Sequence, residues 1–532
     1  MAVSRVKKGP RKINYKQKET YEDFIFDELN VYAGIDCIAT LDLLRALFPK
    51  LIAKPKYRNV CANDVTEGNA PDILTELLEV KTLALEFTCD LKITGMFYDQ
   101  EANSQMGERM RQDMDDTKQR IDLLAGMDVP LSGGAFYNYL YRTKGYCSVV
   151  KTKTGDEATS GEALEALAEI YEDDRELLFD IKRFIDVRAM YNGFIDGYIE
   201  KFVKHDSRIH CDYLLHGTKS HRLSSQNPNM LNMSRGYYDY NTRNNYVATP
   251  GYSMVAIDFS SCECKILAAL SGDEAMIDAC RKGYDFHSFT ASMMSGMSYE
   301  EFVSRKHEPA LNLMRQNAKA TTFGLLYGSS VGGIAHTLGI TPAEAQIIID
   351  AYFDKFPQVK SWIFDQHKHA MLNQYIYTNF GQRVQCQGAR QVFKGSAAYN
   401  ASMRLSQNSG IQSPASTFGL VCFAMYNKAL RERGLGRAVL TVYDSIEVEI
   451  VRGREAEAIE LGNYYLDDWP QENFEWLTFP IGCDAELGNT FGNLEEVHRG
   501  ATQDECENIL RDLYEKYTPP AHEQYILDNG GH

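Results

Sequence analysis

Residues 252–272 read YSMVAIDFSSCECKILAALSG. An apolar run typical of a buried strand ends at Asp258, and a helical pattern begins near Ser260 or Ser261. A carboxylate at the end of a strand, beside the start of a helix, is well placed to bind a metal ion. Aspartate is also a common helix N-cap, so a capping role for Asp258 is the competing interpretation.

A second segment, MRQNAKATTFGLLYGSS at residues 314–330, repeats cations and then aromatics at every fourth position. On a helix, Arg315, Lys319, Phe323 and Tyr327 would form one stripe. The cations could meet phosphates and the rings could meet a base or sugar, which suits a nucleoside triphosphate. An ordinary amphipathic helix, with its cations in water and its aromatics in the core, is the alternative.

A third segment, AVLTVYDSIEVEI at residues 438–450, alternates apolar and polar residues on both sides of a short break. This pattern predicts a β-hairpin. The break holds Tyr443, Asp444 and Ser445, and Asp444 alone could be a simple turn residue.

The rest of the chain predicts an α+β fold, because helical stretches enclose strand-like ones. Strand-like pieces, RIHCDYLL and YSMVAIDF, lie within 205–260. At 532 residues, the chain is long enough for two to four domains or subdomains. Helical spacing is found at 31–50, at 73–130 around the extended link LKITGMFYD, at 160–204 in two helices, and from 261 to about 375.

Composition indicates a folded protein, since 44% of residues are hydrophobic. No apolar run is long enough to span a bilayer and no secretory signal is present, so we expect no membrane partner. Twelve scattered cysteines without a CxxC pair favour reduced thiols and a cytoplasmic location, in the host cytoplasm if the source is viral. The net charge of -17 argues only weakly against DNA binding, because the acids are concentrated at 156–175 and 494–515.

Taken together, the three segments resemble motifs A, B and C of family A DNA polymerases, the group of bacterial DNA polymerase I and its phage and organelle relatives. Motif A resembles DYSQIELR and here reads DFSSCECK, residues 258–265. Motif B resembles RxxAKxxNFGxxYG and here reads RQNAKATTFGLLYG, residues 315–328. Motif C resembles VHDE and here reads VYDS, residues 442–445.

Three further segments are similar to the family, and the resemblance covers roughly residues 75–492. They are GTKSHRLSSQNPNMLN at 217–232, YDFHSFTA at 284–291 and RLSQNSGIQSPAS at 404–416. The resemblance implies a right-handed palm, fingers and thumb. The implied divisions are an N-terminal segment at 1–72, palm base and thumb at 73–204, palm at 205–274, fingers at 275–400, palm again at 401–492, and a C-terminal extension at 493–532.

The resemblance also implies a metal site for two Mg²⁺ ions, which Mn²⁺ could replace. Its ligands would be the carboxylates of Asp258 and Asp444 and the backbone carbonyl of Phe259. Lys319 and Arg315 would neutralise the β- and γ-phosphates of a dNTP, and Lys319 could protonate the leaving group.

Other residues take implied roles around the nucleotide and the DNA. His287 would add a phosphate contact, Phe323 would stack on the nucleotide and Tyr327 would pack near the template base. Glu263 would crowd the 2′ position of the sugar and exclude ribonucleotides. Contacts to the primer–template would come from Arg222, Asn229, Asn232, Arg404, Asn408 and Gln412.

Several positions depart from the family motifs, and none of them removes a metal-binding aspartate or a motif B cation. Tyr443 and Ser445 could alter the position of the primer end, and Leu231 could loosen minor-groove readout. These changes indicate a divergent, phage-like member. The departures are Leu231, Ser261, Lys265, Thr322, Tyr443 and Ser445.

Near the N-terminus, Tyr32 and Asp36 in YAGID resemble the YxxxD motif that ends the family's 3′–5′ exonuclease domain. The acids that this domain needs farther upstream have no counterpart, so we expect no proofreading by this chain alone. A separate exonuclease subunit could dock here, or the segment could be a remnant. An ordinary i, i+4 helical pair is the alternative.

The sequence therefore predicts a DNA-directed DNA polymerase with primer–template DNA and dNTPs as partners, and a processivity factor as a further candidate partner. A single-subunit RNA polymerase is one alternative, although Glu263 and motif B favour deoxynucleotides. A non-catalytic DNA-binding descendant is the other. Such a protein would be expected to lose Asp258, Asp444 or Lys319, and all three are present.

Overall fold

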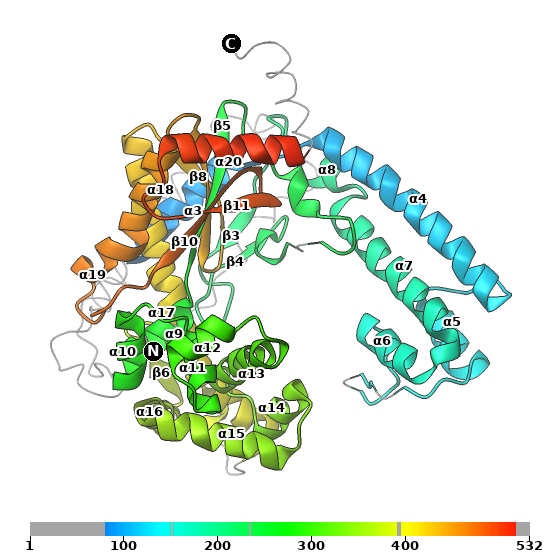
Figure 1. The fold of residues 1–532 in the computed structure, drawn as a ribbon, viewed down its shortest axis with the longest axis horizontal. Helices are drawn as coiled ribbons and strands as arrows, with labels where there is room; N and C mark the ends of the chain where they lie inside the picture. The colour runs from blue at the N-terminus through cyan, green and yellow to red at the C-terminus, as the bar shows by residue number, and fades with distance from the viewer. Residues whose placement is uncertain (1–79, 149, 153, 234–235, 391–394, 518–532) are drawn as a thin grey trace, which may run out of the picture.

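The computed structural model describes residues 80–148, 150–152, 154–233, 236–390 and 395–517. A five-stranded sheet is flanked by helices, and a long helical arm and a helical lobe extend from it (Figure 1). In Figure 1 the sheet lies uppermost, the arm descends on the right and the lobe lies below the sheet. This combination of helices and an antiparallel sheet confirms the predicted α+β fold.

The main sheet is antiparallel and has the strand order β11-β10-β5-β9-β8. Its centre is β5, so both neighbours of the Asp258 strand come from much later in the chain. β8 and β9 form the predicted hairpin, with Tyr443 and Asp444 as its two loop residues. The strands are β5 (Tyr252–Phe259), β8 (Gly436–Val442), β9 (Ser445–Val451), β10 (Cys483–Thr490) and β11 (Asn493–Val497).

Both faces of this sheet are covered, because successive side chains of a strand point to opposite sides. Val255 and Ile257 of β5 pack in one core with Phe423 of α17 (Ala397–Glu432). Met254, on the opposite face of β5, belongs to a second core. Fully burying such a side chain contributes about 1.5–3 kcal/mol, so the two cores hold the central strand firmly in register.

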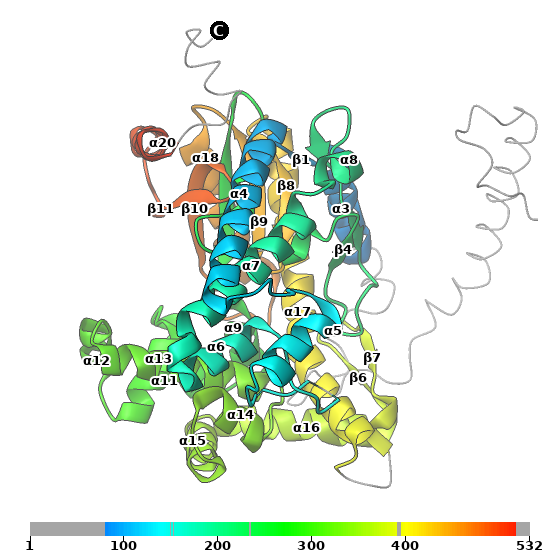
Figure 2. The same ribbon diagram turned by 90° about the vertical axis from the view of Figure 1, so that its right-hand side faces the viewer.

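Other helices and short strands surround the sheet. The helix α17 runs from the sheet toward the lobe and contacts α3 and α9 (Figure 2). The remaining elements here are α3 (Thr82–Thr94), α9 (Cys262–Ser271), α18 (Glu455–Asn463), α19 (Trp469–Asn473), α20 (Gln503–Lys516), β1 (Met96–Phe97), β2 (Arg208–Ile209), β3 (Asp212–Leu214) and β4 (Ser224–Gln226).

The arm is built on two long helices that lie side by side in both views (Figures 1 and 2). The first is α4, which starts where the Asp99 side chain accepts a hydrogen bond from the Ala102 N–H and stops at left-handed Gly126. A separate small core fills the tip of the arm. The helices are α4 (Gln100–Ala125), α5 (Gly133–Asn138), α6 (Gly161–Ile170), α7 (Arg175–Phe194) and α8 (Tyr198–Phe202).

The lobe is helical and carries the cation–aromatic segment on α13. That helix begins at Pro309, whose ring suits a first turn, and packs against α11. The elements of the lobe are α10 (Glu274–Arg281), α11 (Phe286–Ser295), α12 (Tyr299–Arg305), α13 (Pro309–Leu326), α14 (Val331–Leu338), α15 (Pro342–Lys355), α16 (Pro357–Asn373), β6 (Tyr375–Tyr377) and β7 (Arg383–Gln385).

Two predicted boundaries differ from the structure. The palm was expected to end at residue 492, but β11 begins at Asn493 and pairs with β10, so the sheet continues past that point. The stretch 160–204 forms three helices, α6, α7 and α8, where two were expected, because left-handed Gly197 separates α8 from α7. The helix expected at 31–50 lies outside the described residues.

The ten cysteines in the described ranges are all unpaired. Cys262 and Cys264 both lie in the main core as small apolar side chains. No described helix is at once long enough and apolar enough to cross a membrane.

Candidate active site

The structure places Asp258 of β5 beside Asp444, which lies in the loop between β8 and β9. Asp258 lies near the end of β5, directly opposite Ser445 of β9, and both aspartates are exposed. The backbone N–H of Phe259 donates a 3.0 Å hydrogen bond to the carbonyl of Asp444, which ties the hairpin loop to β5. The N-cap position of α9 is Ser261, so the capping interpretation of Asp258 is wrong.

The surroundings of this pair disfavour negative charge. The protein atoms around Asp258 desolvate its carboxylate, although it keeps access to solvent, and this raises its pKa. The carboxylates of Asp444, Glu447, Asp484 and Glu486 raise the pKa of Asp258 further. Desolvation likewise raises the pKa of Asp444. A cation bound between these acids would relieve their mutual repulsion.

The donor atoms fit a hard divalent cation, which prefers carboxylate and carbonyl oxygens. The described part of the chain contains no cluster of three or more His, Cys, Asp or Glu side chains arranged to hold a metal. Ions bound at Asp258 and Asp444 would therefore complete their coordination with backbone oxygen, water or substrate. This is the pattern of sites where Mg²⁺ is shared between protein and phosphates.

The cation–aromatic stripe forms as predicted along α13, and Tyr327 lies at its C-terminal end. Phe323 and Tyr327 are half-buried and stacked, with ring centroids 5.7 Å apart. Arg315 donates from Nε to Asp285 Oδ2 at 2.8 Å and to Ser288 Oγ at 3.0 Å. Lys319 is exposed and makes no hydrogen bond or ion pair with any described residue, so its charge is available to a ligand.

His287 lies on α11 beside this stripe, with its ring centroid 5.3 Å from that of Phe323. It is 5% exposed, and its Nδ1 has no hydrogen-bond partner among the described residues. Burial lowers the pKa of His287 to about 4, while Asp285 opposes the shift. The ring is therefore neutral near pH 7 and can donate a hydrogen bond to a phosphate.

Glu263 connects α9 to α13 and to the loop before β4. Tyr327 donates from its hydroxyl to Glu263 Oε2 at 2.6 Å, and Arg222 pairs with Oε1. Burial raises the pKa of Glu263, against the opposing effects of Arg222 and Tyr327. A cavity of about 30 Å³ lies beside this network and is lined by Arg222, Cys262, Glu263, Ala415, Ser416, Tyr443 and Asp444.

In the loop before β5, the two predicted DNA-contacting asparagines are exposed. Asn229 accepts a hydrogen bond from Ser225, and Asn232 accepts one from the Tyr443 hydroxyl at 3.0 Å. The Arg222 guanidinium lies 5.5 Å from the ring centroid of Tyr443. The structure thus brings the loop, the hairpin and Glu263 together, with Arg222 turned toward protein groups.

The other three residues predicted to contact DNA lie on α17, at every fourth position, and face the end of α13. They are Arg404, Asn408 and Gln412. Arg404 is exposed, and its side-chain stem packs against Gly328. In the orientation that satisfies its neighbours, the Asn408 amide donates to the carbonyls of Leu326 and Tyr327 at 3.0 and 3.1 Å. Gln412 hydrogen-bonds the Tyr327 side chain. Asn408 and Gln412 therefore brace the α13 terminus in this structure.

Tyr32 and Asp36, the predicted exonuclease motif, lie outside the described residues.

Four residues near the site were missed by the sequence argument. Asp285 holds Arg315, and Gln407 binds the carbonyl of Leu325. Asp484 lies opposite Asp258 on β10, and burial raises the pKa of Glu447 on β9 to about 7. Of these four residues, only Glu447 could have been found from the sequence, through strand alternation in the predicted hairpin. The other three contacts join residues that are far apart in the chain.

Paired acids at the sheet, linked through Glu263 to the end of a helix with a cation–aromatic stripe, are the arrangement expected of a nucleic-acid polymerase. The family model described as "DNA polymerase family A" matches residues 100–493. The chain belongs to DNA polymerase family A.

Among curated relatives, DNA polymerase I of Chloroflexus aurantiacus is 28% identical over 481 residues, 88% of this chain and 47% of the relative. Thermostable DNA polymerase I of Thermus aquaticus is 31% identical over 359 residues, 67% of this chain and 41% of the relative. The chain thus spans less than half the length of these relatives.

A solved structure gives a matching fold. It is described as the "POL domain of Pol1 from M. smegmatis complex with DNA primer-template and dNTP". The TM-score is 0.69 at 25% sequence identity, over 79% of this chain and 71% of the other.

Proposed function

We propose that this chain is a DNA-directed DNA polymerase that extends a primer 3′ end with dNTPs on a DNA template. The observation that carries the proposal is the placement of Asp258 of β5 beside Asp444 of the β8–β9 loop. Family membership supports it, as does the similarity to a domain whose solved structure holds primer–template and dNTP. Nucleotidyl transfer needs few covalent partners and depends on positioning and charge neutralisation.

Asp258, Asp444 and the Phe259 carbonyl would hold two divalent ions, normally Mg²⁺. Bound there, such ions lower the pKa of the primer 3′-hydroxyl and stabilise the charge on the triphosphate. Asp258 is fixed in β5, and Asp444 lies in the hairpin loop that is tied to β5. The two carboxylates would therefore be held in place to bind these ions.

The α13 stripe would bind the incoming nucleotide. Lys319 and Arg315 neutralise the β- and γ-phosphates, and Lys319 gives a proton to the departing pyrophosphate. The exchange of Asp285 for a phosphate would release Arg315 from its present ion pair. Phe323 stacks on the base, and neutral His287 donates a hydrogen bond to a phosphate oxygen.

Glu263 would exclude ribonucleotides by crowding the sugar 2′ position. Its hydrogen bond from Tyr327 and its pairing with Arg222 hold the carboxylate in one orientation. Tyr327 would also pack near the template base. Contacts to primer–template are proposed for Arg222, Asn229, Asn232, Arg404, Asn408 and Gln412.

The sheet with α17 would be the palm, the lobe would be the fingers and the arm would be the thumb. In this assignment the palm includes β11, so it extends past the boundary at 492 expected from sequence. Most of the proposed nucleotide-binding side chains come from α13 and α11, which pack together.

Primer extension with Mg²⁺ tests the proposal by comparing the unaltered chain with Asp444→Ala. We expect extension by the former and its loss in the variant, since one of two carboxylates is removed. Asp512→Ala, an exposed acid on α20, is the matched control and should extend normally. Equal extension by the unaltered chain and Asp444→Ala would refute the mechanism.

A further inference from the structure

Glu447 lies on β9, on the same face of the strand as Ser445, the residue that follows Asp444. Side chains two apart on a strand point to one side, so Ser445, Glu447 and Glu449 of β9 share a face. Directly opposite pairs also share a face, so Ser445 and Asp258 belong to it together. Glu447 thus lies on the metal-site side of the sheet.

Glu447 is buried in an unusual way. It is 1% exposed, and its Oε1 accepts a 2.6 Å hydrogen bond from the Ser445 hydroxyl. Its Oε2 has no hydrogen-bond partner among the described residues. Burying a carboxyl group with an unpartnered oxygen is costly, so stability alone does not account for an acid here.

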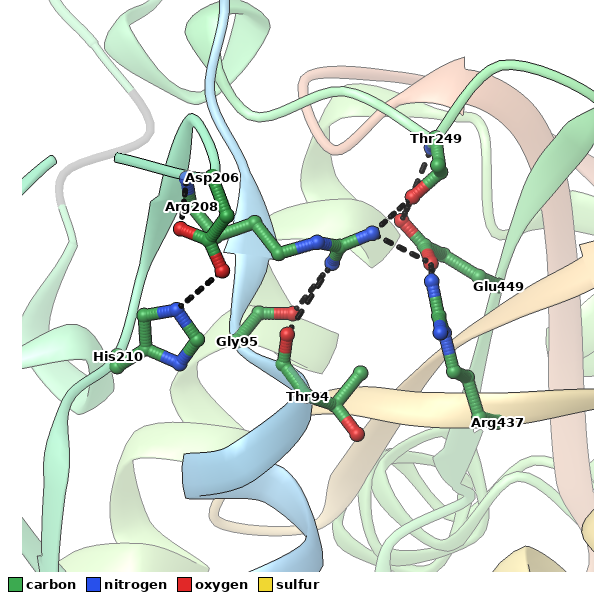
Figure 3. Close-up of polar contacts among 8 residues, drawn as sticks. All are labelled: Thr94, Gly95, Asp206, Arg208, His210, Thr249, Arg437 and Glu449. Carbon is green, nitrogen blue, oxygen red and sulfur yellow. Dashed lines mark hydrogen bonds and ion pairs between the residues drawn. The ribbon is translucent and has the colours of Figure 1, made fainter. Parts of the chain in front are cut away.

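Glu449, two residues farther along, shows what a structural acid looks like in this strand. It is fully buried and clamped by Arg208 at 3.4 Å, Arg437 at 3.0 Å and the Thr249 N–H at 2.9 Å (Figure 3). No described residue forms such an ion pair with Glu447. The charged side chains that interact electrostatically with Glu447 include those of Arg243, Asp444 and Asp258.

The Ser445 hydroxyl connects Glu447 to the loop that carries Asp444. Its Oγ lies 2.6 Å from Glu447 Oε1 and 3.3 Å from the carbonyl of Val442, on the other side of the loop. Thr441 in turn donates to the Ser445 carbonyl at 2.8 Å. These contacts span the hairpin loop on both sides of Asp444. The motif glutamate expected at position 445 is replaced by serine, and the next acid along β9 on that face is Glu447.

We propose that Glu447 is a positioning residue of the metal site, which acts through the Ser445 hydroxyl to hold the Asp444 loop in its cation-binding geometry. The inference rests on the proposed function, because it assumes that Asp444 binds a divalent ion. It adds a residue for which the motif comparison provides no counterpart. Mutating residues that orient a metal ligand typically lowers metal affinity or activity about 10- to 100-fold.

The test uses the full chain and measures Mn²⁺ binding by electron paramagnetic resonance, without DNA or turnover. The variants are Glu447→Leu, Ser445→Ala and the two combined, with Glu449→Gln as the control acid on the same strand. Thermal unfolding of each variant is recorded beside the binding curve. Primer extension at varied Mg²⁺ concentration provides a second readout.

We expect Glu447→Leu and Ser445→Ala each to weaken Mn²⁺ binding about 10-fold or more. The double variant should be no weaker than the single variants, because both interrupt one connection. Glu447→Leu should keep or raise the Tm, since an apolar side chain replaces a buried acid. Glu449→Gln should lower the Tm and leave the Mn²⁺ affinity of the folded protein unchanged.

Unchanged Mn²⁺ binding in Ser445→Ala would overturn the proposal, even if Glu447→Leu failed to fold. Additive losses in the double variant would also overturn it, since the two residues would then act separately. If the unaltered chain bound Mn²⁺ but extended no primer, the proposed function would fail while the binding comparison still decided the role of Glu447.

Discussion

Replacing Glu263 by alanine should change which sugar the site accepts. The Glu263 side chain is 12% exposed, and two groups fix its carboxylate, the Tyr327 hydroxyl at 2.6 Å and the Arg222 guanidinium. Alanine removes the whole carboxylate and opens room for a 2′-hydroxyl. Size exclusion by one small group typically contributes about 1–3 kcal/mol, so we expect discrimination against ribonucleotides to fall about 10- to 200-fold.

The assay is single-nucleotide primer extension, with kcat/KM measured for a dNTP and for the rNTP of the same base. Glu263→Gln keeps the size of the side chain and should retain most of the discrimination. Tyr327→Phe removes one hydrogen bond and leaves Arg222 in place, so its effect should fall between those of glutamine and alanine. In Glu263→Ala the Arg222 guanidinium loses its partner. Because the Arg222 side chain is 29% exposed, it can be hydrated, and the Tm of this variant should change little.

The reasoning would be refuted if Glu263→Ala discriminated between the two sugars as well as the unaltered chain. Equal losses of kcat/KM for both nucleotides would show that Glu263 positions the sugar and does not exclude the 2′-hydroxyl.

Three further outcomes are expected. Because the pKa of His287 is about 4 in the folded chain against an ordinary 6.5, the unfolded chain binds the extra proton between these values. Stability should therefore fall as the pH drops below about 6.5, by about 1.4 kcal/mol per pH unit until about pH 4. His287→Gln should flatten that slope in urea unfolding, and an unchanged slope would contradict the assignment. Lys319→Ala should leave the Tm unchanged, because no described residue pairs with the lysine. The same variant should lower kcat/KM for dNTP about 100-fold or more in steady-state extension. A loss below about threefold would argue against the role of Lys319. Gly328→Ala should cost about 1–2 kcal/mol in chemical unfolding, since Gly328 has φ +70° and a Cβ there would lie 2.9 Å from Arg404 Cγ; full stability would mean that this turn relaxes.

The local elements were predictable because each depends on a short pattern. The alternation at 438–450 specified the hairpin, and the spacing of Arg315, Lys319 and Phe323 specified a helix with one marked face. The apolar run ending at Asp258 likewise formed β5. In these stretches backbone geometry and side-chain periodicity agree, so neighbouring residues contain enough information.

Side-chain partners were not predictable in the same way. Arg222 and Asn408 were expected to face DNA, but in this structure they contact Glu263 and the end of α13. These contacts depend on how α9, α13 and α17 pack, and a polar side chain in a local pattern carries no mark of its distant partner. The roles proposed for both residues toward DNA remain predictions.

By itself, the sequence determined the strand, the hairpin, the helical stripe and the family that these motifs resemble. Only the tertiary structure decided that Asp258 lies opposite Ser445 on one side and Asp484 on the other. Strand register follows from packing both faces of a sheet, which involves residues far apart in the chain. The same register brought Glu447 beneath the Asp444 loop, where a buried acid joined to Ser445 becomes a candidate part of the site.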